Sequence, residues 1–189
     1  MLDVSPPTLQ LTMPAEALTR FFPLLRRGVW IEVETGNSLQ QLLVDQLGIG
    51  QEFIDRRITT IFLNSKVVDN LDAAFISPDA TLALSSAVPG LVGATMQRGG
   101  FYATMRGAVT RSPERRPTSG ACGRIRVKLF NLLMHDLGDL LLARGIILPT
   151  TEATELQGIS LPPQKLQQEG MGQAGELRLQ ILFDVSTCE

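Results

Sequence analysis

Few residues in this sequence are suited to catalytic or metal chemistry. His135 is the only histidine and Asp136 follows it, while the two cysteines, Cys122 and Cys188, form no CxxC pair. Adjacent residues of a helix point about 100° apart, so His135 and Asp136 do not face each other as an acid–base pair would. The sequence has no P-loop and no GxGxxG motif. We therefore expect no enzyme, no catalytic residue, no metal site and no cofactor.

The strongest charge feature is a basic region between residues 98 and 128. It carries a net charge of +7, whereas residues 1–97 carry −4 and residues 129–189 carry −5. The basic residues are Arg98, Arg106, Arg111, Arg115, Arg116, Arg124, Arg126 and Lys128. The net charge of −2 and the pI near 5.5 argue against a general nucleic-acid-binding protein. We interpret these residues as a contact surface for acidic parts of the chain or for a partner, with an anionic ligand or RNA as the alternative.

Composition favours a folded protein with an aliphatic core. Of the 189 residues, 44% are hydrophobic but only 5% are aromatic, and the mean hydropathy is +0.13. The longest uncharged stretch is 80–97. It contains Pro89, Gly90 and Gly93, which predict strand and loop rather than a membrane span. No signal-peptide pattern opens the sequence, so we expect a cytoplasmic protein without membrane contact.

The first half of the chain predicts one helix among several strands. Residues 29–34 alternate as a half-buried strand does, and the apolar run 17–25 is interpreted as an earlier strand. Ser38 and Gln41 form a capping box at the start of a helix that ends near Gly48. Strands are predicted at 58–63, 66–68 and 81–84, with a turn at Asn64-Ser65 between the first two.

The second half predicts two strands and one helical stretch. Residues 123–129 alternate between aliphatic and basic side chains, a helix follows up to Gly145, and residues 177–185 form a strand. Residues 98–121 and 149–175 are rich in glycine and proline and predict loops. Two strands and a helix are too little for an independent domain, so we expect them to join the first sheet or to pair across a dimer.

Residues 17–93 resemble the family of small sulfur-carrier proteins. This family includes the molybdopterin synthase small subunit and the thiamine-biosynthesis sulfur carrier. The resemblance rests on five segments in order, at 21–28, 31–43, 61–68, 77–84 and 87–90. It implies an α+β fold, a ubiquitin-like β-grasp with a mixed sheet and one packed helix, followed by a C-terminal strand-helix-strand extension. The implied domains are an N-terminal arm (1–16), a β-grasp domain (17–97), a basic linker (98–121) and an α+β extension (122–189).

The chain departs from this family at its tail. Family carriers end in Gly-Gly, whose terminal carboxylate is adenylated and then thiolated. Here the only comparable pair is Gly99-Gly100, and 89 residues follow it. A carrier function would require cleavage after Gly100 and an activating enzyme as partner. The pair is otherwise an ordinary flexible loop.

Three functions follow as expectations. The first is a non-catalytic β-grasp module that acts through protein–protein contact, with a second copy of the chain as one candidate partner. The second is a sulfur-carrier precursor that is cleaved after Gly100. The third is an accessory protein that binds an anionic ligand or RNA through residues 98–128. Nucleic acid is the less expected partner because no aromatic-rich binding motif accompanies the basic residues.

Overall fold

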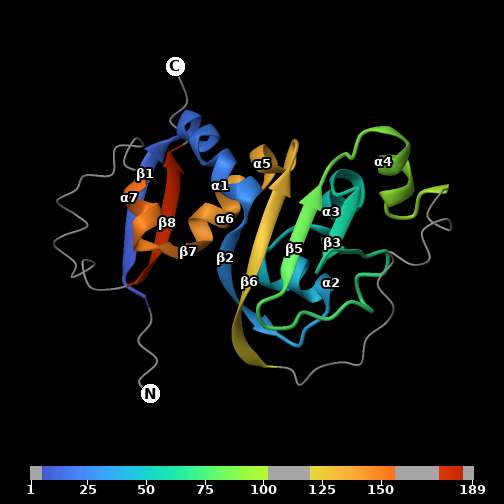
Figure 1. Cartoon of the computed structure of the whole chain (residues 1–189), viewed down its shortest axis with the longest axis horizontal. Coiled ribbons are helices and arrows are strands. Elements are labelled where there is room, and N and C mark those ends of the chain that lie inside the picture. The colour runs from blue at the N-terminus through green and yellow to red at the C-terminus, as the bar shows by residue number, and fades with distance from the viewer. Residues whose placement is uncertain (1–5, 102–119, 156–174, 185–189) are drawn as a thin grey trace. The chain divides into compact units, whose positions relative to one another are not determined.

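The chain forms two compact units of mixed α and β structure. The computed structural model describes residues 6–101, 120–155 and 175–184 (Figure 1). One unit combines residues 1–23 with residues 138–189, and we call it the terminal unit; the other, residues 24–137, is the central unit. The domain boundaries predicted at 17, 98 and 122 group the residues differently and remain predictions.

The described part of the central unit contains five strands in the order β2-β6-β5-β3-β4. Their bounds are β2 (Val29–Thr35), β3 (Thr60–Leu63), β4 (Lys66–Val67), β5 (Thr81–Ser85) and β6 (Ala121–Phe130). β6 is antiparallel to β2 and parallel to β5, whereas β3 is antiparallel to both β5 and β4. The strands predicted at 29–34, 58–63, 66–68, 81–84 and 123–129 are thus confirmed, and β6 joins the sheet as one of the two expected alternatives.

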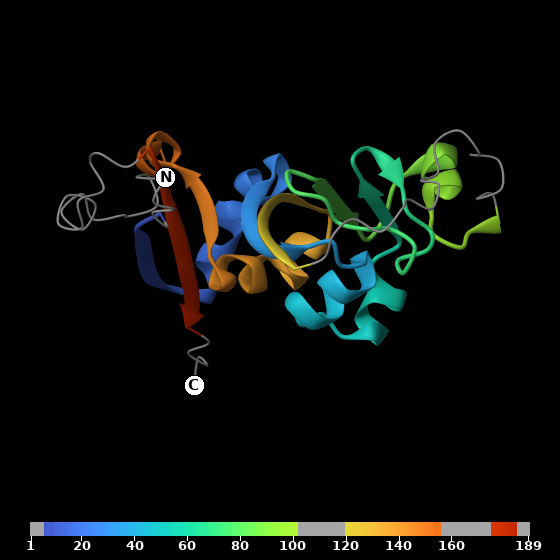
Figure 2. The same cartoon turned by 90° about the horizontal axis from the view of Figure 1, so that it is seen from below.

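Helices cover one face of these strands. The helical segments between β2 and β3 are α2 (Leu39–Gln41), the π-helical turn η2 (Leu42–Gln46) and α3 (Gln51–Arg57), and Figure 2 shows them together on one side of the central strands. The predicted capping box is present, since Ser38 Oγ accepts from the Gln41 amide and the Gln41 side chain accepts from the Ser38 amide. Leu39, Leu42 and Ile54 are fully buried. This inner face holds the core of the central unit.

Turn residues with positive φ fix the register of the short strands. Asn64 and Ser65 adopt φ of 50° and 65° between β3 and β4, as the predicted turn requires. The Asn64 side chain also accepts a hydrogen bond from the Thr81 amide, at 2.8 Å. This bond ties the turn to the first residue of β5.

Among the residues described for the terminal unit, three strands lie in the order β1-β8-β7. They are β1 (Thr8–Pro14), β7 (Ile146–Pro149) and β8 (Glu176–Asp184). β8 lies between a parallel β1 and an antiparallel β7. The helical elements of this unit are the 3-10 helix η1 (Ala15–Phe21), α6 (Gly138–Arg144) and α7 (Thr150–Glu155). Phe21 of η1 packs edge-on against Phe183 of β8, with ring centroids 6.3 Å apart.

Three sequence-based assignments are wrong. Residues 149–175, predicted as loop, include the end of β7 and the helix α7 (Thr150–Glu155). The run 17–25, predicted as a strand, belongs to η1 and to α1 (Phe22–Arg27). Its buried residues are Ala17, Phe21, Leu24 and Leu25, a spacing that follows the helical period rather than alternation. The stretch 80–97, predicted as strand and loop, includes the helix α4 (Gly90–Met96). The prediction of strand 177–185 is confirmed by β8, but β8 is not a spare strand because it is paired on both sides.

The short helix α5 (Leu133–Asp136) also belongs to the central unit. It confirms part of the helical stretch predicted before Gly145. Gly145 itself ends α6 with φ of 99°, as expected for a residue that terminates a helix. In the described ranges, no helix combines the length and the apolar character that crossing a membrane requires.

Candidate functional site

The face of the central sheet opposite α2, η2 and α3, which we call the outer face, carries the side chains of β6 that do not enter the core. Ile125, Val127 and Leu129 point inward and are buried. Because successive side chains of a strand alternate between faces, their neighbours lie on the other face. These are Arg124, Arg126, Lys128 and Phe130, all half-buried. β6 therefore presents three cations in a row that ends in an aromatic ring.

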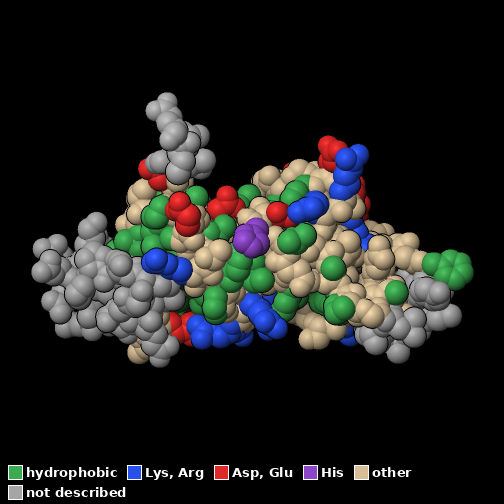
Figure 3. All heavy atoms as spheres, turned by 90° about the horizontal axis from the view of Figure 1, so that it is seen from above, with side chains coloured by type: hydrophobic (Ala, Val, Ile, Leu, Met, Phe, Trp, Pro, Cys, Tyr) green, Lys and Arg blue, Asp and Glu red, His purple; other side chains and the backbone are tan. Residues whose placement is uncertain are grey.

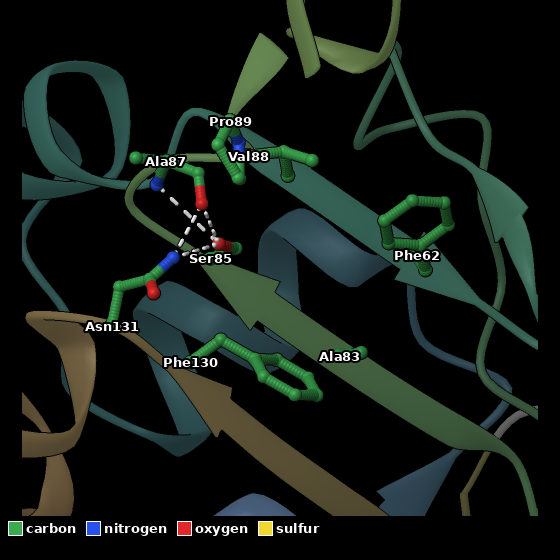
Figure 4. Close-up of a pocket in the computed structure, with 8 residues that line it drawn as sticks. All are labelled: Phe62, Ala83, Ser85, Ala87, Val88, Pro89, Phe130 and Asn131. Atoms are coloured by element: carbon green, nitrogen blue, oxygen red, sulfur yellow. Dashed lines mark hydrogen bonds between the residues drawn. The ribbon is translucent and has the colours of Figure 1, made fainter. Parts of the chain in front are cut away.

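An apolar cavity of about 300 Å³ opens on this face beside the aromatic end of the row (Figure 4). Ala83 of β5 lies between Phe62 of β3 and Phe130 of β6, so a small side chain separates two large ones. Phe62 and Ala83 are direct partners in the β3–β5 pair. Val88 and Pro89 complete the apolar lining from the segment that follows β5. The cavity exists because alanine leaves a depression between two rings.

Polar groups at the rim of this cavity bond to one another. Asn131 Nδ2 donates to Ser85 Oγ at 3.0 Å and also to the carbonyl of Ala87. Ser85 Oγ donates to the same carbonyl at 2.8 Å and accepts from the Ala87 amide at 3.3 Å. This network, drawn in Figure 4, holds residues 85–87 against the start of the loop after β6. Because these polar groups have partners, the cavity offers mainly apolar surface to a ligand.

A second cavity of about 350 Å³ adjoins the first and shares Ala87 and Val88 with it. Thr59, Thr60, Ser86 and Gln97 supply polar atoms to its lining. Thr60 is buried, and its Oγ1 has no hydrogen-bond partner within the described part of the chain. The two cavities lie on either side of Ala87-Val88 in the segment 86–97, which we call the strap.

The strap is closely packed within itself and anchored at its C-terminal end. Gly93 of α4 packs so closely on Val88 that a Cβ atom at position 93 would lie 1.6 Å from the Val88 carbonyl oxygen. After the strap, the Arg98 amide donates to the Thr59 carbonyl at 2.8 Å. The Arg98 guanidinium donates to the Ile54 carbonyl at 3.0 Å and to Asp55 at 3.1 Å. Its side chain is only 14% exposed, so Arg98 holds the strap on α3.

The structure brings together only some of the predicted basic residues. Arg106, Arg111, Arg115 and Arg116 lie outside the described residues. Arg98 contacts the acidic Asp55 of the same chain, and its contact with a partner or an anion stays a prediction. Arg124, Arg126 and Lys128 share the outer face of β6. The basic region is therefore not one described surface, and the part that can be assigned is this row of three.

The three cations of the row differ in their surroundings. Arg124 faces Glu32 across the β2–β6 pair. Arg126 donates from Nη2 to the Arg27 carbonyl at 3.0 Å. Lys128 has no ion-pair partner among the residues that the structure describes, and it lies next to Ala83 in the β5–β6 register. Lys128 is thus the cation of the row nearest to the floor of the apolar cavity.

Gly28 makes room for the basic stems. A Cβ atom at position 28 would lie 2.8 Å from both Arg126 Nε and Lys128 Cγ, and the φ of Gly28 is +106°. Glycine is suited to this position because it accepts positive φ and allows the close approach. The placement of Arg126 and Lys128 over the turn before β2 therefore depends on this glycine.

Gly99 and Gly100 follow the anchored Arg98. Gly99 has φ of 65°, and the Gly100 amide donates to the Gln97 carbonyl at 3.2 Å. The two residues thus form a turn at the end of the strap. Whether they serve as a carrier tail stays a prediction.

The histidine is not among the residues that line either cavity. His135 is exposed, and Figure 3 shows the single histidine at the molecular surface. Asp136 pairs instead with Arg57 of α3, whose Nη2 lies 2.7 Å from Asp136 Oδ2. In the described ranges, no group of three or more His, Cys, Asp or Glu side chains is placed to hold a metal ion.

Sequence reasoning missed the apolar cavity, although a signal for it was present. Phe62 lies between the inward-facing Ile61 and Leu63. Phe130 follows Arg124, Arg126 and Lys128 at the same two-residue spacing, so its side chain lies on the outer face with theirs. Two large aromatic residues at outward positions of predicted strands mark an apolar patch on the outer face. That the two rings flank one alanine could not be known without the strand order.

Comparison of this chain with protein-family models, curated proteins and solved structures finds no match.

Proposed function

We propose that the central unit is a β-grasp whose first strand comes late in the chain. In a β-grasp, the first strand pairs antiparallel with the second and parallel with the last. β6 has this pattern, since it is antiparallel to β2 and parallel to β5. The resemblance assigned the first strand to residues 21–28, which are helical up to Arg27. Strand order and direction support the assignment of β6 to that place.

The function that the geometry supports best is a non-catalytic protein-interaction module. The single observation that carries it is the apolar cavity beside Lys128 on the outer face. At about 300 Å³ this cavity lies at the small end of ligand pockets, a size suited to one anchoring side chain rather than a large cofactor. Apolar side chains that fill such pockets provide most of the affinity at protein interfaces.

Charge complementarity defines the partner. Lys128 lies next to the cavity floor, and Arg126 and Arg124 continue the row along β6. An extended segment of a partner protein would place one large apolar side chain between Phe62 and Phe130, with carboxylates following along the row. Such charges steer and orient a partner more than they tighten the complex, so the apolar anchor dominates the affinity.

The two alternatives have less support. Cleavage after Gly100 would sever β6, the strand between β2 and β5, from the rest of a carrier. For an anionic ligand or RNA, the described cations are few, since Arg98 is anchored to Asp55 and Arg124 faces Glu32. Mass spectrometry of the protein purified from its own host tests the carrier alternative. We expect a chain that continues beyond Gly100, not a fragment that ends there.

A peptide-display selection tests the proposed function. The full chain is the bait, and the probe is a library of random linear peptides of about nine residues, enough to span a strand of the sheet. We expect enrichment of peptides that combine one Leu, Ile, Phe or Trp with neighbouring Asp or Glu. Enrichment without an apolar residue, or no enrichment over empty support, would overturn the proposal.

A matched pair of variants locates the binding surface. Ala83→Leu fills the depression between the two rings, whereas Thr81→Leu changes the same face of the same strand outside the cavity. Fluorescence anisotropy with a selected peptide should show that Ala83→Leu weakens binding about tenfold or more, the effect of losing one buried anchor. Thr81→Leu should leave the affinity within about threefold, as expected for a neighbouring contact. Equal effects of both substitutions would contradict a site in the cavity.

A further inference from the structure

The terminal unit has an open strand edge. β1 lies at the end of the order β1-β8-β7, so among the described residues it is paired on one side only. It is seven residues long, from Thr8 to Pro14, and pairs with β8 along its whole length. Pro7 precedes it and Pro14 ends it. Because proline has no amide hydrogen, the residues that can donate along this edge lie between these two prolines.

The pairing with β8 determines which backbone groups face outward. The Arg178 amide donates to the Pro7 carbonyl at 2.8 Å, and Thr8 is the register partner of Arg178. In a parallel pair this pattern turns the C=O group of Pro7, and the N–H and C=O groups of Leu9, Leu11 and Met13, toward β8. The same groups of Thr8, Gln10 and Thr12 therefore point to the open edge. Three amides and three carbonyls are available there for another strand.

The edge lacks the features that normally prevent strand addition. Natural edge strands are commonly shortened, charged or interrupted by proline within the strand. β1 has the sequence Thr-Leu-Gln-Leu-Thr-Met-Pro, which carries no charge and has proline only at its end. Thr8, Gln10 and Thr12 have exposed side chains, so no described residue covers them.

We propose that β1 pairs antiparallel with β1 of a second copy of this chain. The edge is complementary to itself when Gln10 faces Gln10 and Thr8 faces Thr12 of the other copy. This register uses all six outward groups, and every pair is a hydrogen-bonded one. It also places Thr opposite Thr, a pair that stabilises sheets, and sets no like charges against each other. A shift by two residues in either direction leaves some of these groups unpaired or faces Pro14.

The resulting dimer has two-fold symmetry and a continuous sheet of β7-β8-β1 from one copy joined to β1-β8-β7 from the other. A closed isologous pair of this kind pairs the β1 edges of both copies at once, so no third copy can add to this edge. The site is separate from the cavity of the central unit, so the inference goes beyond the proposed function and does not rest on it.

Sedimentation of the full chain tests the pairing through one backbone amide. Gln10→Pro removes the central outward N–H but no bond to β8, whereas Gln10→Ala keeps that N–H and loses only the side chain. Over a concentration series reaching about 1 mM, the range of weak complexes, the parent chain and Gln10→Ala should form dimers. Gln10→Pro should raise the dimer dissociation constant about tenfold or more, since two symmetry-related bonds are lost. Circular dichroism checks that each variant is folded.

Site-specific crosslinking tests the register. Cysteines are introduced singly into a chain in which Cys122 and Cys188 are changed to Ser. In the proposed register the Cα atoms of the two Gln10 residues are about 5.5 Å apart, within disulfide range. The two Thr8 residues are separated by four residues of strand, roughly 14 Å, which is too far. Mild oxidation should therefore link Gln10→Cys into a covalent dimer and leave Thr8→Cys monomeric.

Each outcome decides the proposal. A parent chain that stays monomeric throughout the series, or a Gln10→Pro variant that dimerises as the parent does, would overturn it. Efficient crosslinking through Thr8→Cys with none through Gln10→Cys would overturn the register. Peptide binding by the cavity of the central unit is measured independently, so its presence or absence does not change how these results are interpreted.

Discussion

The outer face of the central unit and the open edge of β1 offer different parts of the chain to a partner. The outer face offers side chains: an apolar cavity floored by Ala83 and a cation at Lys128. The edge offers backbone groups of Thr8, Gln10 and Thr12. Side chains can select one partner sequence, whereas backbone groups accept any strand of suitable geometry. Selectivity at the edge must therefore come from register and from the prolines that bound it.

The largest effect is expected where a substitution reaches the core beneath the outer face. Leu129 is fully buried on the inner side of β6, so Leu129→Ala should lower the free energy of unfolding by about 2–5 kcal/mol. Lys128→Ala, one residue away on the outer face, should change it by no more than about 0.5 kcal/mol. Chemical denaturation measures both. Similar losses for the two variants would contradict the assignment of opposite faces to β6.

A smaller effect is expected at the anchor of the strap. Arg98→Ala removes hydrogen bonds to Ile54 and Asp55 from a side chain that is 14% exposed, although Asp55 itself is 57% exposed. We expect a loss of about 1–2 kcal/mol, most of it from the buried bond to the Ile54 carbonyl. Peptide binding should weaken as well, since Val88 and Pro89 belong to the strap.

Arg56→Ala is the matched control for Arg98→Ala. Arg56 pairs with Glu52 one turn earlier on α3, and both side chains are 76% exposed. Its loss should cost no more than about 0.5 kcal/mol and should not change peptide binding. If Arg56→Ala and Arg98→Ala had equal effects on stability and on binding, the strap would not depend on the Arg98 anchor.

The smallest effect is expected from salt. Raising the ionic strength screens exposed charges, so the peptide complex at the outer face should weaken by about threefold between low and high salt. The β1 pair has no charged residue in either strand and should be insensitive to the same change. Isothermal titration and sedimentation over one salt series measure the two. A steep loss of peptide affinity would favour the anionic-ligand alternative over an apolar anchor.

The sequence predicted the elements that depend on local chemistry. The capping box at Ser38, the turn at Asn64-Ser65 and the alternation in 29–34 and 123–129 each give a signal within a few residues, and all are present. The strand prediction for 17–25 is wrong because most of these residues are apolar. Such a run shows neither the alternation of a strand nor the period of a helix. The helix in this segment is stabilised by the burial of Phe21, Leu24 and Leu25 in the folded chain.

The candidate sites depend on pairings between distant residues, which local patterns do not contain. The cavity needs β3, β5 and β6 side by side, and β6 follows β5 by more than thirty-five residues of chain. The open edge needs β8 to lie between β1 and β7, although the sequence only indicated that a strand exists near 177–185. Arg98 shows the same limit, since its place in the basic region did not indicate the contacts with α3 that make it an anchor.

The measurement that most directly tests this account is a crossed experiment on the two surfaces. Peptide affinity and dimer dissociation are both measured for Ala83→Leu and for Gln10→Pro. We expect Ala83→Leu to weaken the peptide and leave the dimer unchanged, and Gln10→Pro to weaken the dimer and leave peptide binding unchanged. If either variant, while still folded, weakened both peptide binding and dimer formation, the two surfaces would not act separately and the account would be contradicted.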